Sequence, residues 1–192
     1  MNTNRYYDEN AQAFFDSTLK VDMQPLYYRF LPFMQEGGSI LDAGCGSGRD
    51  AYFFKTKGYS VTAMDASKTL CDLASAHLNQ DVHCVSFEDI EWQGEFNAVW
   101  ACASLLHVPK AELPAVFLKL FQSLKPNGVL YCSFKYGSEE RQQGGRTFTD
   151  LDEAELIQVL DQTCVQYSLE TWITEDQRPD RSERWLNAII KI

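Results

Sequence analysis

Short apolar runs alternate with amphipathic segments along most of the chain. Five runs have the length and composition of buried strands, and they are residues 39–42, 60–64, 82–87, 96–102 and 129–134. Between them apolar residues recur at helical spacing, most clearly from Leu113 to Leu124. Strands that alternate with helices predict a parallel sheet with helices on both faces.

The end of the chain breaks this alternation. Residues 165–174 and 185–192 are both strand-like, and only ten residues separate them. A parallel crossover needs a dozen or more residues, so the last strand should run antiparallel to the one before it. The predicted fold is an α/β three-layer sandwich, with a seven-stranded, mostly parallel, Rossmann-like sheet and an antiparallel last strand.

About 38 residues precede the first strand. They contain two amphipathic segments, near residues 6–19 and 23–33, and Tyr6, Tyr7, Phe14 and Phe15 crowd the first one. Such aromatic residues either pack into the core or form a lid over a ligand, and the sequence leaves both open. We therefore expect one domain over residues 1–192, with a helical lid or cap in residues 1–38 and an α/β core in residues 39–192.

Charge and composition exclude several classes of protein. The formal net charge of -10 argues against a general affinity for nucleic acid or anionic membranes, since phosphate binding needs a basic surface. The first ten residues are polar, and no apolar run is long enough to span a bilayer, so we expect a cytoplasmic protein that is a monomer or a weak dimer. The six cysteines include no C-x-x-C pair, so we expect buried thiols and no metal site.

The strongest motif is ILDAGCGSGRD, residues 40–50. A buried strand ends at Asp42, three alternating glycines follow, and a helix then begins, whose free N–H groups suit an anionic ligand. The next strand ends at Asp65, whose carboxylate can accept hydrogen bonds from ribose hydroxyls. Arg49 stands where a dinucleotide-binding G-x-G-x-x-G motif needs its third glycine. A tight turn with a helix-capping aspartate is the structural alternative.

The G-x-G-x-G pattern with its preceding acid resembles motif I of class I S-adenosylmethionine (SAM)-dependent methyltransferases. The stretch GCGSGRDAYFFKTKGYSVTAMDAS is similar to small bacterial methyltransferases grouped with the tellurite-resistance methyltransferases. WACASLLHV, SFKYG, GRTF, DQRPDRSERWLN and the N-terminal YYDENAQAFF resemble a bacterial subgroup of methyltransferase-domain proteins. The resemblance implies methyl transfer with SAM as cofactor and S-adenosylhomocysteine as product.

The resemblance also implies which residues hold SAM. The methionine end meets the first acid, the glycine loop and the segment after the fourth strand: Asp42, Gly44, Cys45, Gly46, Gly48, Ala101, Cys102 and Ala103. The ribose and adenine meet Asp65, Ala66, Ser86 and Phe87. Many relatives have an aspartate in place of Ser86, so Glu88 or Asp89 is the expected substitute in the adenine contact.

Segments that follow the parallel strands should form the rim of the ligand site. Three arginines from different segments, Arg146, Arg178 and Arg181, can converge there on a small anionic methyl acceptor, such as an organic acid, tellurite or selenite. Alternatively they pair with Asp150, Asp176, Asp180 and Glu183 and only brace the loops. Further candidates for acceptor contacts are Tyr6, Tyr7 and Trp185.

His107 is the candidate general base, because it follows a strand end near the expected methyl position. A packed, hydrogen-bonded histidine is the other interpretation. Two alternative functions remain open at this point, a non-catalytic SAM-binding sensor or partner protein and an NAD(P)-dependent oxidoreductase.

Overall fold

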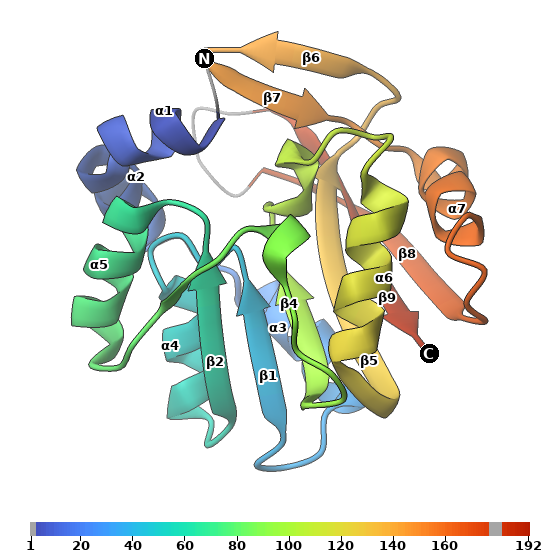
Figure 1. Ribbon diagram of the computed structural model, residues 1–192, viewed down its shortest axis with the longest axis horizontal. Coiled ribbons are helices and arrows are strands. Elements are labelled where there is room, and N and C mark those ends of the chain that lie inside the picture. Colours follow the sequence, from blue (N-terminus) through green and yellow to red (C-terminus); the bar gives the residue numbers. More distant parts are fainter. Residues whose placement is uncertain (1–2, 177–181) are drawn as a thin grey trace.

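A computed structural model describes residues 3–176 and 182–192 of the chain. Seven strands form the main sheet: β1 (Ser39–Ala43), β2 (Ser60–Asp65), β3 (His83–Cys84), β4 (Phe96–Ala101), β5 (Leu124–Lys135), β8 (Ser168–Glu175) and β9 (Arg184–Lys191). Their order is β3-β2-β1-β4-β5-β9-β8 (Figure 1). The pairs from β3 to β5 are parallel, and β9 is antiparallel to both β5 and β8. The predicted sheet and its antiparallel last strand are confirmed.

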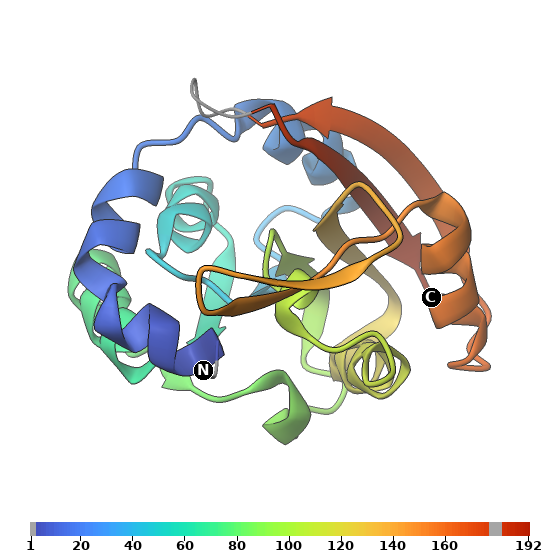
Figure 2. The same cartoon turned by 90° about the horizontal axis from the view of Figure 1, so that it is seen from above.

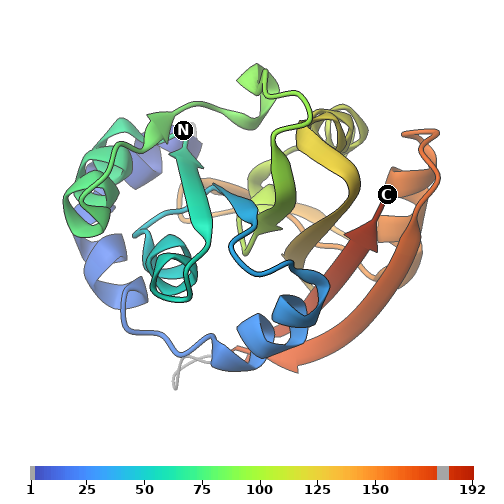
Figure 3. The same ribbon diagram turned by 90° about the horizontal axis from the view of Figure 1, so that it is seen from below.

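Alternate residues of the central strands enter two different cores. In β1, Leu41 packs with α6 (Leu113–Ser123) and α7 (Glu153–Asp161), whereas Ile40 packs with α3 (Gln24–Phe30) and α4 (Arg49–Thr56). The period of two along a strand places these side chains on opposite faces of the sheet. Figure 3 shows α3 and α4 on one side of the sheet and α6 on the other. These layers are the predicted three-layer sandwich.

The N-terminal segment forms more helices than the two that we predicted. It contains α1 (Thr3–Glu9), α2 (Ala11–Thr18), α3 and the 3-10 turn Leu31–Phe33. The first predicted helix is interrupted at Asn10, which is not helical. Helix α3 buries Leu26, Tyr27 and Phe30, whereas α1 has no buried residue and α2 has only Ala11. Only α3 is therefore core, and α1 and α2 lie over the end of the sheet.

Two further elements differ from the prediction. The expected strand at residues 82–87 is reduced to His83–Cys84, and a 3-10 turn at Phe87–Asp89 follows. The expected loop after β5 is a hairpin of β6 (Glu140–Gln143) and β7 (Arg146–Thr149). Gly144 and Gly145, both with positive φ, make its two-residue turn. The hairpin lies over the end of the sheet beside α1 (Figure 2).

Side chains cap the starts of two helices. Ser67 caps α5 (Lys68–Leu78), because its Oγ accepts a hydrogen bond from the N–H of Leu70 at 3.2 Å. Helix α7 is capped by Asp152, not by Thr149 or Asp150. Those two residues serve the hairpin instead, since Thr149 bonds the Val108 carbonyl and Asp150 pairs with Arg141.

Within the described residues, the helices are all too short or too polar to cross a lipid bilayer.

Candidate active site

The glycine loop between β1 and α4 packs closely against the segment that follows β4. Gly44 has φ of 79°, and a Cβ added there would lie 2.4 Å from Cβ of Ser104. A Cβ at Gly46 would lie 3.0 Å from the Phe14 ring of α2. Any larger residue at Gly44 would therefore clash and also adopt an unfavourable φ. The loop brings the chain backbone to the floor of two cavities.

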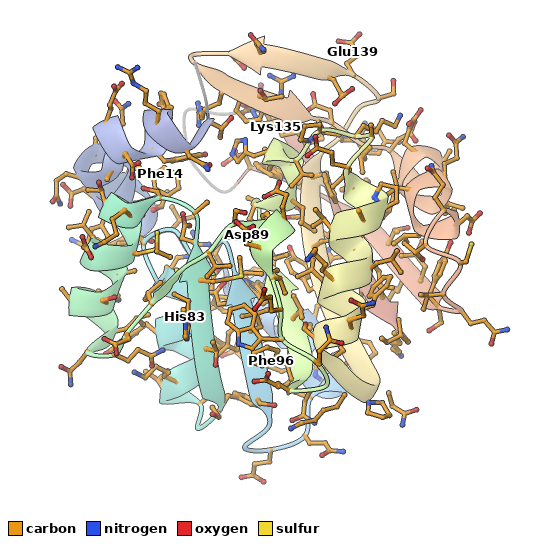
Figure 4. The ribbon with its side chains drawn as sticks, in the orientation of Figure 1. Phe14, His83, Asp89, Phe96, Lys135 and Glu139 are labelled. Carbon is orange, nitrogen blue, oxygen red and sulfur yellow. The ribbon has the colours of Figure 1, made fainter. Side chains whose placement is uncertain are left out.

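Two cavities of about 600 Å³ and 590 Å³ open at the carboxyl ends of the parallel strands. They share a wall formed by Tyr7, Phe14, Gly44, Gly46, Ala103 and His107. In Figure 4, Phe14 and Lys135 lie toward the end of the sheet that α1, α2 and the hairpin cover, whereas Phe96, at the start of β4, lies toward the other end. This is the edge at which open α/β sheets bind their ligands.

One cavity has the groups that an adenosine needs. It is lined by Asp65, Ala66, Ser86, Phe87, Glu88 and Asp89. The two carboxylate oxygens of Asp65 each accept a backbone N–H bond of 2.9 Å, from Gly46 and from Ser67. These bonds fix the carboxylate and leave lone pairs for ribose hydroxyls. Ser86 Oγ donates to Asp89 at 2.8 Å, and Glu88 and Asp89, the two acids predicted as substitutes at the adenine edge, both line this cavity.

Asp42 lies buried under the glycine loop, and its Oδ2 has no hydrogen-bond partner among the described residues. Burial, and then the neighbouring Asp50 carboxylate, raise the pKa of Asp42 well above its ordinary value. Asp50 is fully satisfied: it accepts from Arg49 at 2.6 and 3.0 Å, from Trp100 Nε1 at 2.8 Å, and from the Tyr27 hydroxyl. Burial alone would raise the pKa of Asp50, but Arg49 and these bonds lower it. Asp42 itself lines neither cavity, but its Oδ2 is an acceptor that the described residues leave unused beside the glycine loop.

The second cavity extends from the glycine loop to the hairpin and β9. Lys135 is paired there with Glu183 at 2.9 Å, and Arg49 with Asp50. Arg146 has no carboxylate within ion-pair distance among the described residues, and its buried Nε has no hydrogen-bond partner there. Its guanidinium instead lies 4.6 Å from the Tyr6 ring centroid and 5.0 Å from that of Phe148. Arg146 therefore brings to this cavity a cation that has no carboxylate partner within the described part of the chain.

His107 joins the N-terminal segment to the hairpin. Its Nδ1 lies 2.7 Å from the Thr147 carbonyl, which can only accept, so Nδ1 carries the proton. Nε2 is then an acceptor, and the Tyr7 hydroxyl donates to it at 2.7 Å. Burial of the ring, opposed by the Thr147 bond, lowers the pKa of His107 to about 4. Of the two interpretations of His107, the structure shows a packed, hydrogen-bonded ring that also lines both cavities.

Among the described residues, neither the cysteines nor the acidic side chains provide a reactive thiol or a metal site. All six thiols are free, and burial raises the pKa of Cys102 to about 12, so its thiol is a poor nucleophile at neutral pH. Among the described residues, no group of three or more His, Cys, Asp or Glu side chains is placed to hold a metal ion.

The remaining predicted residues divide into three groups. Cys45, Cys102 and Trp185 line the second cavity. Gly48, Ala101 and Tyr6 line neither cavity: Gly48 caps α4, Ala101 is fully buried at the end of β4, and Tyr6 packs under Arg146. Arg178 and Arg181 lie outside the described residues. Of the acids proposed as braces, Asp150 holds Arg141, at 2.7 Å, and not Arg146.

Sequence reasoning missed several residues that line the second cavity, namely Thr18, Ser133, Phe148 and Asn187. Phe148 and Thr18 come from the hairpin and α2, which no motif placed here. Ser133 and Asn187 lie inside β5 and β9, and buried polar residues within predicted strands were the one available signal.

Comparisons with known proteins agree with this geometry. Residues 40–128, which contain the glycine loop and Asp65, match the family model for a methyltransferase domain. The chain is similar to the putative methyltransferase YqeM of Bacillus subtilis (strain 168), with 30% identity over 135 residues, which are 62% of the chain and 52% of the relative. The chain thus spans about half the length of the curated relatives that it matches.

Solved structures share the fold of this chain. The 1,6-didemethyltoxoflavin-N1-methyltransferase of Burkholderia thailandensis, which has bound 1,6-didemethyltoxoflavin and S-adenosylhomocysteine, superposes with a TM-score of 0.80 at 18% identity. The alignment covers 98% of this chain and 86% of that one. The [4+2]-cyclase SpnF superposes with a TM-score of 0.72 at 14% identity, over 88% and 80% of the two chains. At these identities the likeness shows the fold alone.

The residues of this site fit SAM. The unpartnered Oδ2 of Asp42 suits the ammonium group of the methionine end, and Asp65 suits the ribose hydroxyls. The close approach at Gly44 leaves no room for a side chain and opens the backbone to the ligand. The wall shared by the two cavities is then the region where the methionine and adenosine halves meet.

Proposed function

We propose that the protein transfers a methyl group from SAM to a small acceptor that carries an acid group. The proposal that the acceptor bears an acid group rests on one observation, which is the environment of Arg146. Its charge faces the second cavity without a carboxylate partner among the described residues, while Lys135 and Arg49 are each already paired. A guanidinium binds carboxylate or oxyanion groups in a fork geometry, so an acid in this cavity would complete its hydrogen bonds.

The size and walls of the cavity support a small organic molecule. About 600 Å³ must hold both the methionine end of SAM and the acceptor. Phe14, Phe148 and Trp185 supply apolar aromatic surface near Arg146. Such a mixture of aromatic walls and one charged anchor is typical of small-molecule sites. Tellurite or selenite would fill only part of this space and would leave the aromatic surface unused.

SAM supplies an electrophilic methyl group on a sulfonium. The protein's own residues would bind and align the reactants: Asp42 and Asp65 hold the two halves of SAM, and Arg146 fixes the acid of the acceptor. Holding reactants in attack geometry can contribute roughly 7–11 kcal/mol. Helices α1 and α2 cover the shared wall and would keep water from the site, since Phe14 and Tyr7 line both cavities.

A screen for transfer of the tritiated methyl group of SAM to small acids, thiols, tellurite and selenite tests this function. We expect turnover with organic acids. Arg146→Glu should raise the acceptor KM by at least tenfold, because it removes a charge-assisted hydrogen bond worth roughly 1.5–3 kcal/mol and reverses the charge. The SAM dissociation constant of this variant should stay within threefold of the wild-type value. Arg5→Glu is the matched control, because Arg5 is an exposed arginine of α1 paired only with Glu9.

Transfer must be measured as well as binding, because a SAM-binding sensor and a cyclase of this fold would both pass a binding assay. SAM binding without transfer to any acceptor in the screen would contradict an enzymatic role. Full turnover by Arg146→Glu would contradict the anionic acceptor.

A further inference from the structure

The oxygen of Tyr7 faces the wall that the two cavities share, and its hydrogen-bonding direction is fixed. His107 Nδ1–H is committed to the Thr147 carbonyl, so Nε2 accepts, and the Tyr7 hydroxyl gives its only proton to Nε2. The Tyr7 oxygen is left with its two lone pairs, of which one is directed to the Arg146 guanidinium and the other remains for the cavity. It can accept a hydrogen bond from a reactant there, but it cannot donate one.

We propose that the acceptor attacks through a hydroxyl or ring N–H group, whose proton passes to the Tyr7 oxygen while the proton of Tyr7 passes to Nε2 of His107. This inference rests on the proposed function and names the reacting group of its substrate. Tyr7 is then a catalytic residue that contacts the acceptor, and His107 acts through it. The acceptor is a small, flat acid whose acidic group is bound by Arg146 and whose methylated atom is a different, protonated one.

The step balances. The new bond to the methyl carbon is formed by an oxygen lone pair of the hydroxyl, or by the electron pair that the departing proton of a ring N–H leaves on nitrogen, and the carbon–sulfur bond breaks with its electron pair going to sulfur. The acceptor atom loses its proton to Tyr7 O, and the original Tyr7 proton completes an imidazolium at His107. That proton leaves to water when the products dissociate.

The electrostatics of the relay suit such an acceptor. Three groups face the His107 ring from different elements, namely Tyr7 from α1, Arg146 from β7 and Lys135 from β5. Burial lowers the pKa of His107 to about 4, and the charges of Arg146 and Lys135 add to this effect. Tyr7 is itself faced by Arg146, Asp65 and Tyr6, and burial raises its pKa. The ring is therefore neutral and able to accept at neutral pH. A hydroxyl or ring N–H becomes strongly acidic as its bond to methyl forms, so a weak base is sufficient.

A pre-ionised acceptor fits this wall poorly. A carboxylate, selenite or tellurite oxygen that approached Tyr7 O would meet lone pairs, with no proton between the two oxygens. The carboxylate of the acceptor has a better partner in Arg146, whose guanidinium carbon lies 5.9 Å from the Tyr7 ring centroid. That separation lets one small molecule contact both residues. Phe148, whose ring centroid is 5.0 Å from that of His107, would pack on its flat body.

The test uses the full chain with tritiated SAM and a matched panel of acceptors. The 2-, 3- and 4-hydroxybenzoates, pyrrole-2-carboxylate and imidazole-4-carboxylate carry both an acid and a protonated nucleophile. Benzoate and the methoxybenzoates carry the acid alone, phenol carries the hydroxyl alone, and selenite and tellurite are already ionised. We expect transfer to at least one member of the first group, with the methyl on oxygen or ring nitrogen by mass spectrometry, and none to benzoate.

Two variants then separate catalysis from folding. Tyr7→Phe and His107→Gln should each lower kcat by at least about 100-fold, the usual range for loss of proton transfer, with the SAM dissociation constant unchanged within threefold. The acid limb of the wild-type pH–kcat profile should lie well below pH 6.5 and should vanish in His107→Gln. Tyr28→Phe and His77→Gln are matched controls, since Tyr28 is exposed on α3 and the half-buried His77 packs against Phe15 and Tyr52, away from both cavities.

A second readout needs no turnover. Nitrogen-15 spectra of the ligand-free protein should show His107 as the Nδ1–H tautomer with a pKa near 4. Tyr7→Phe should raise that pKa, because it removes a hydrogen bond to the neutral ring. An Nε2–H tautomer would overturn the proposal.

The outcomes separate this inference from the function on which it rests. Transfer only to benzoate, selenite or tellurite, or wild-type kcat in Tyr7→Phe, overturns the relay and leaves methyl transfer intact. No SAM binding, or SAM binding with no transfer to any acceptor, overturns the function and the relay together.

Discussion

Asp42 and Asp50 are neighbouring buried carboxylates with opposite surroundings. Asp50 accepts from Arg49, Tyr27 and Trp100, so its charge is compensated inside the protein. Asp42 has an unpartnered Oδ2, and its pKa is raised. A buried polar atom without a partner destabilises the fold unless a ligand completes it. At the residue scale, this difference separates a structural acid from a binding acid.

Replacing Asp42 with asparagine should therefore separate stability from binding. A carboxyl whose pKa is higher in the folded than in the unfolded chain stabilises the fold fully below its ordinary pKa of 3.8, and this contribution is lost as pH rises. At pH 7 the ligand-free Asp42→Asn protein should melt at or above the wild-type temperature. Its SAM dissociation constant should rise by about tenfold or more, since a charge-assisted bond of roughly 1.5–3 kcal/mol is lost.

Calorimetric melting and SAM titration measure the two quantities. Asp72→Asn is the matched control, since Asp72 is exposed on α5 and pairs only with Lys68. Its SAM affinity should equal that of the wild type. A lower melting temperature for Asp42→Asn together with unchanged SAM affinity would show that Asp42 is structural.

The N-terminal helices form a cover, and polar contacts fasten its first helix, α1, to three different elements. Asp8 Oδ1 accepts from Ser67 Oγ at 2.6 Å and from the N–H of Thr69 at 3.2 Å, at the start of α5. Tyr7 bonds His107, and Thr3 Oγ1 accepts from the N–H of Thr147 on β7 at 3.1 Å. Apolar packing holds little of this cover, because α1 and α2 together bury only Ala11. Few buried contacts are typical of elements that open locally.

Removing the Asp8 contact should loosen this cover. In Asp8→Ala we expect SAM to dissociate about three- to tenfold faster, because lids held by a few polar contacts limit ligand release, with little change in the association rate. Stopped-flow displacement of SAM by S-adenosylhomocysteine measures the dissociation rate. Asp16→Ala is the control, since Asp16 contacts only Gln12 within α2. An unchanged dissociation rate in Asp8→Ala would mean that α1 and α2 do not gate the site.

Element-scale features were predictable only where the hydrophobic pattern is strong. The central strands and α6 carry that pattern, and so the sheet and its antiparallel end followed from the sequence. The hairpin strands are polar, and the Gly144–Gly145 turn was their one signal. The bond between Tyr7 and His107 joins residues 100 positions apart through α1 and the hairpin, and no local pattern encodes it.

At the scale of the whole molecule, the ends of five parallel strands, the N-terminal helices and the hairpin enclose one site. Asp42 and Asp65 were identifiable because they lie at the ends of β1 and β2, whose positions the alternation of strands and helices fixes. The acceptor half depends on loops whose placement no strand dictates. This is the physical reason that the SAM half of the site is well marked in the sequence and the acceptor half is not.

Binding of SAM is the claim on which everything else depends. Isothermal titration of the full chain with SAM should give one site, with a dissociation constant that rises at least about tenfold in Asp65→Ala, where the hydrogen bonds to the ribose are lost. NADH should give no binding heat under the same conditions. No heat with SAM, or saturable binding of NADH in its place, would contradict the account.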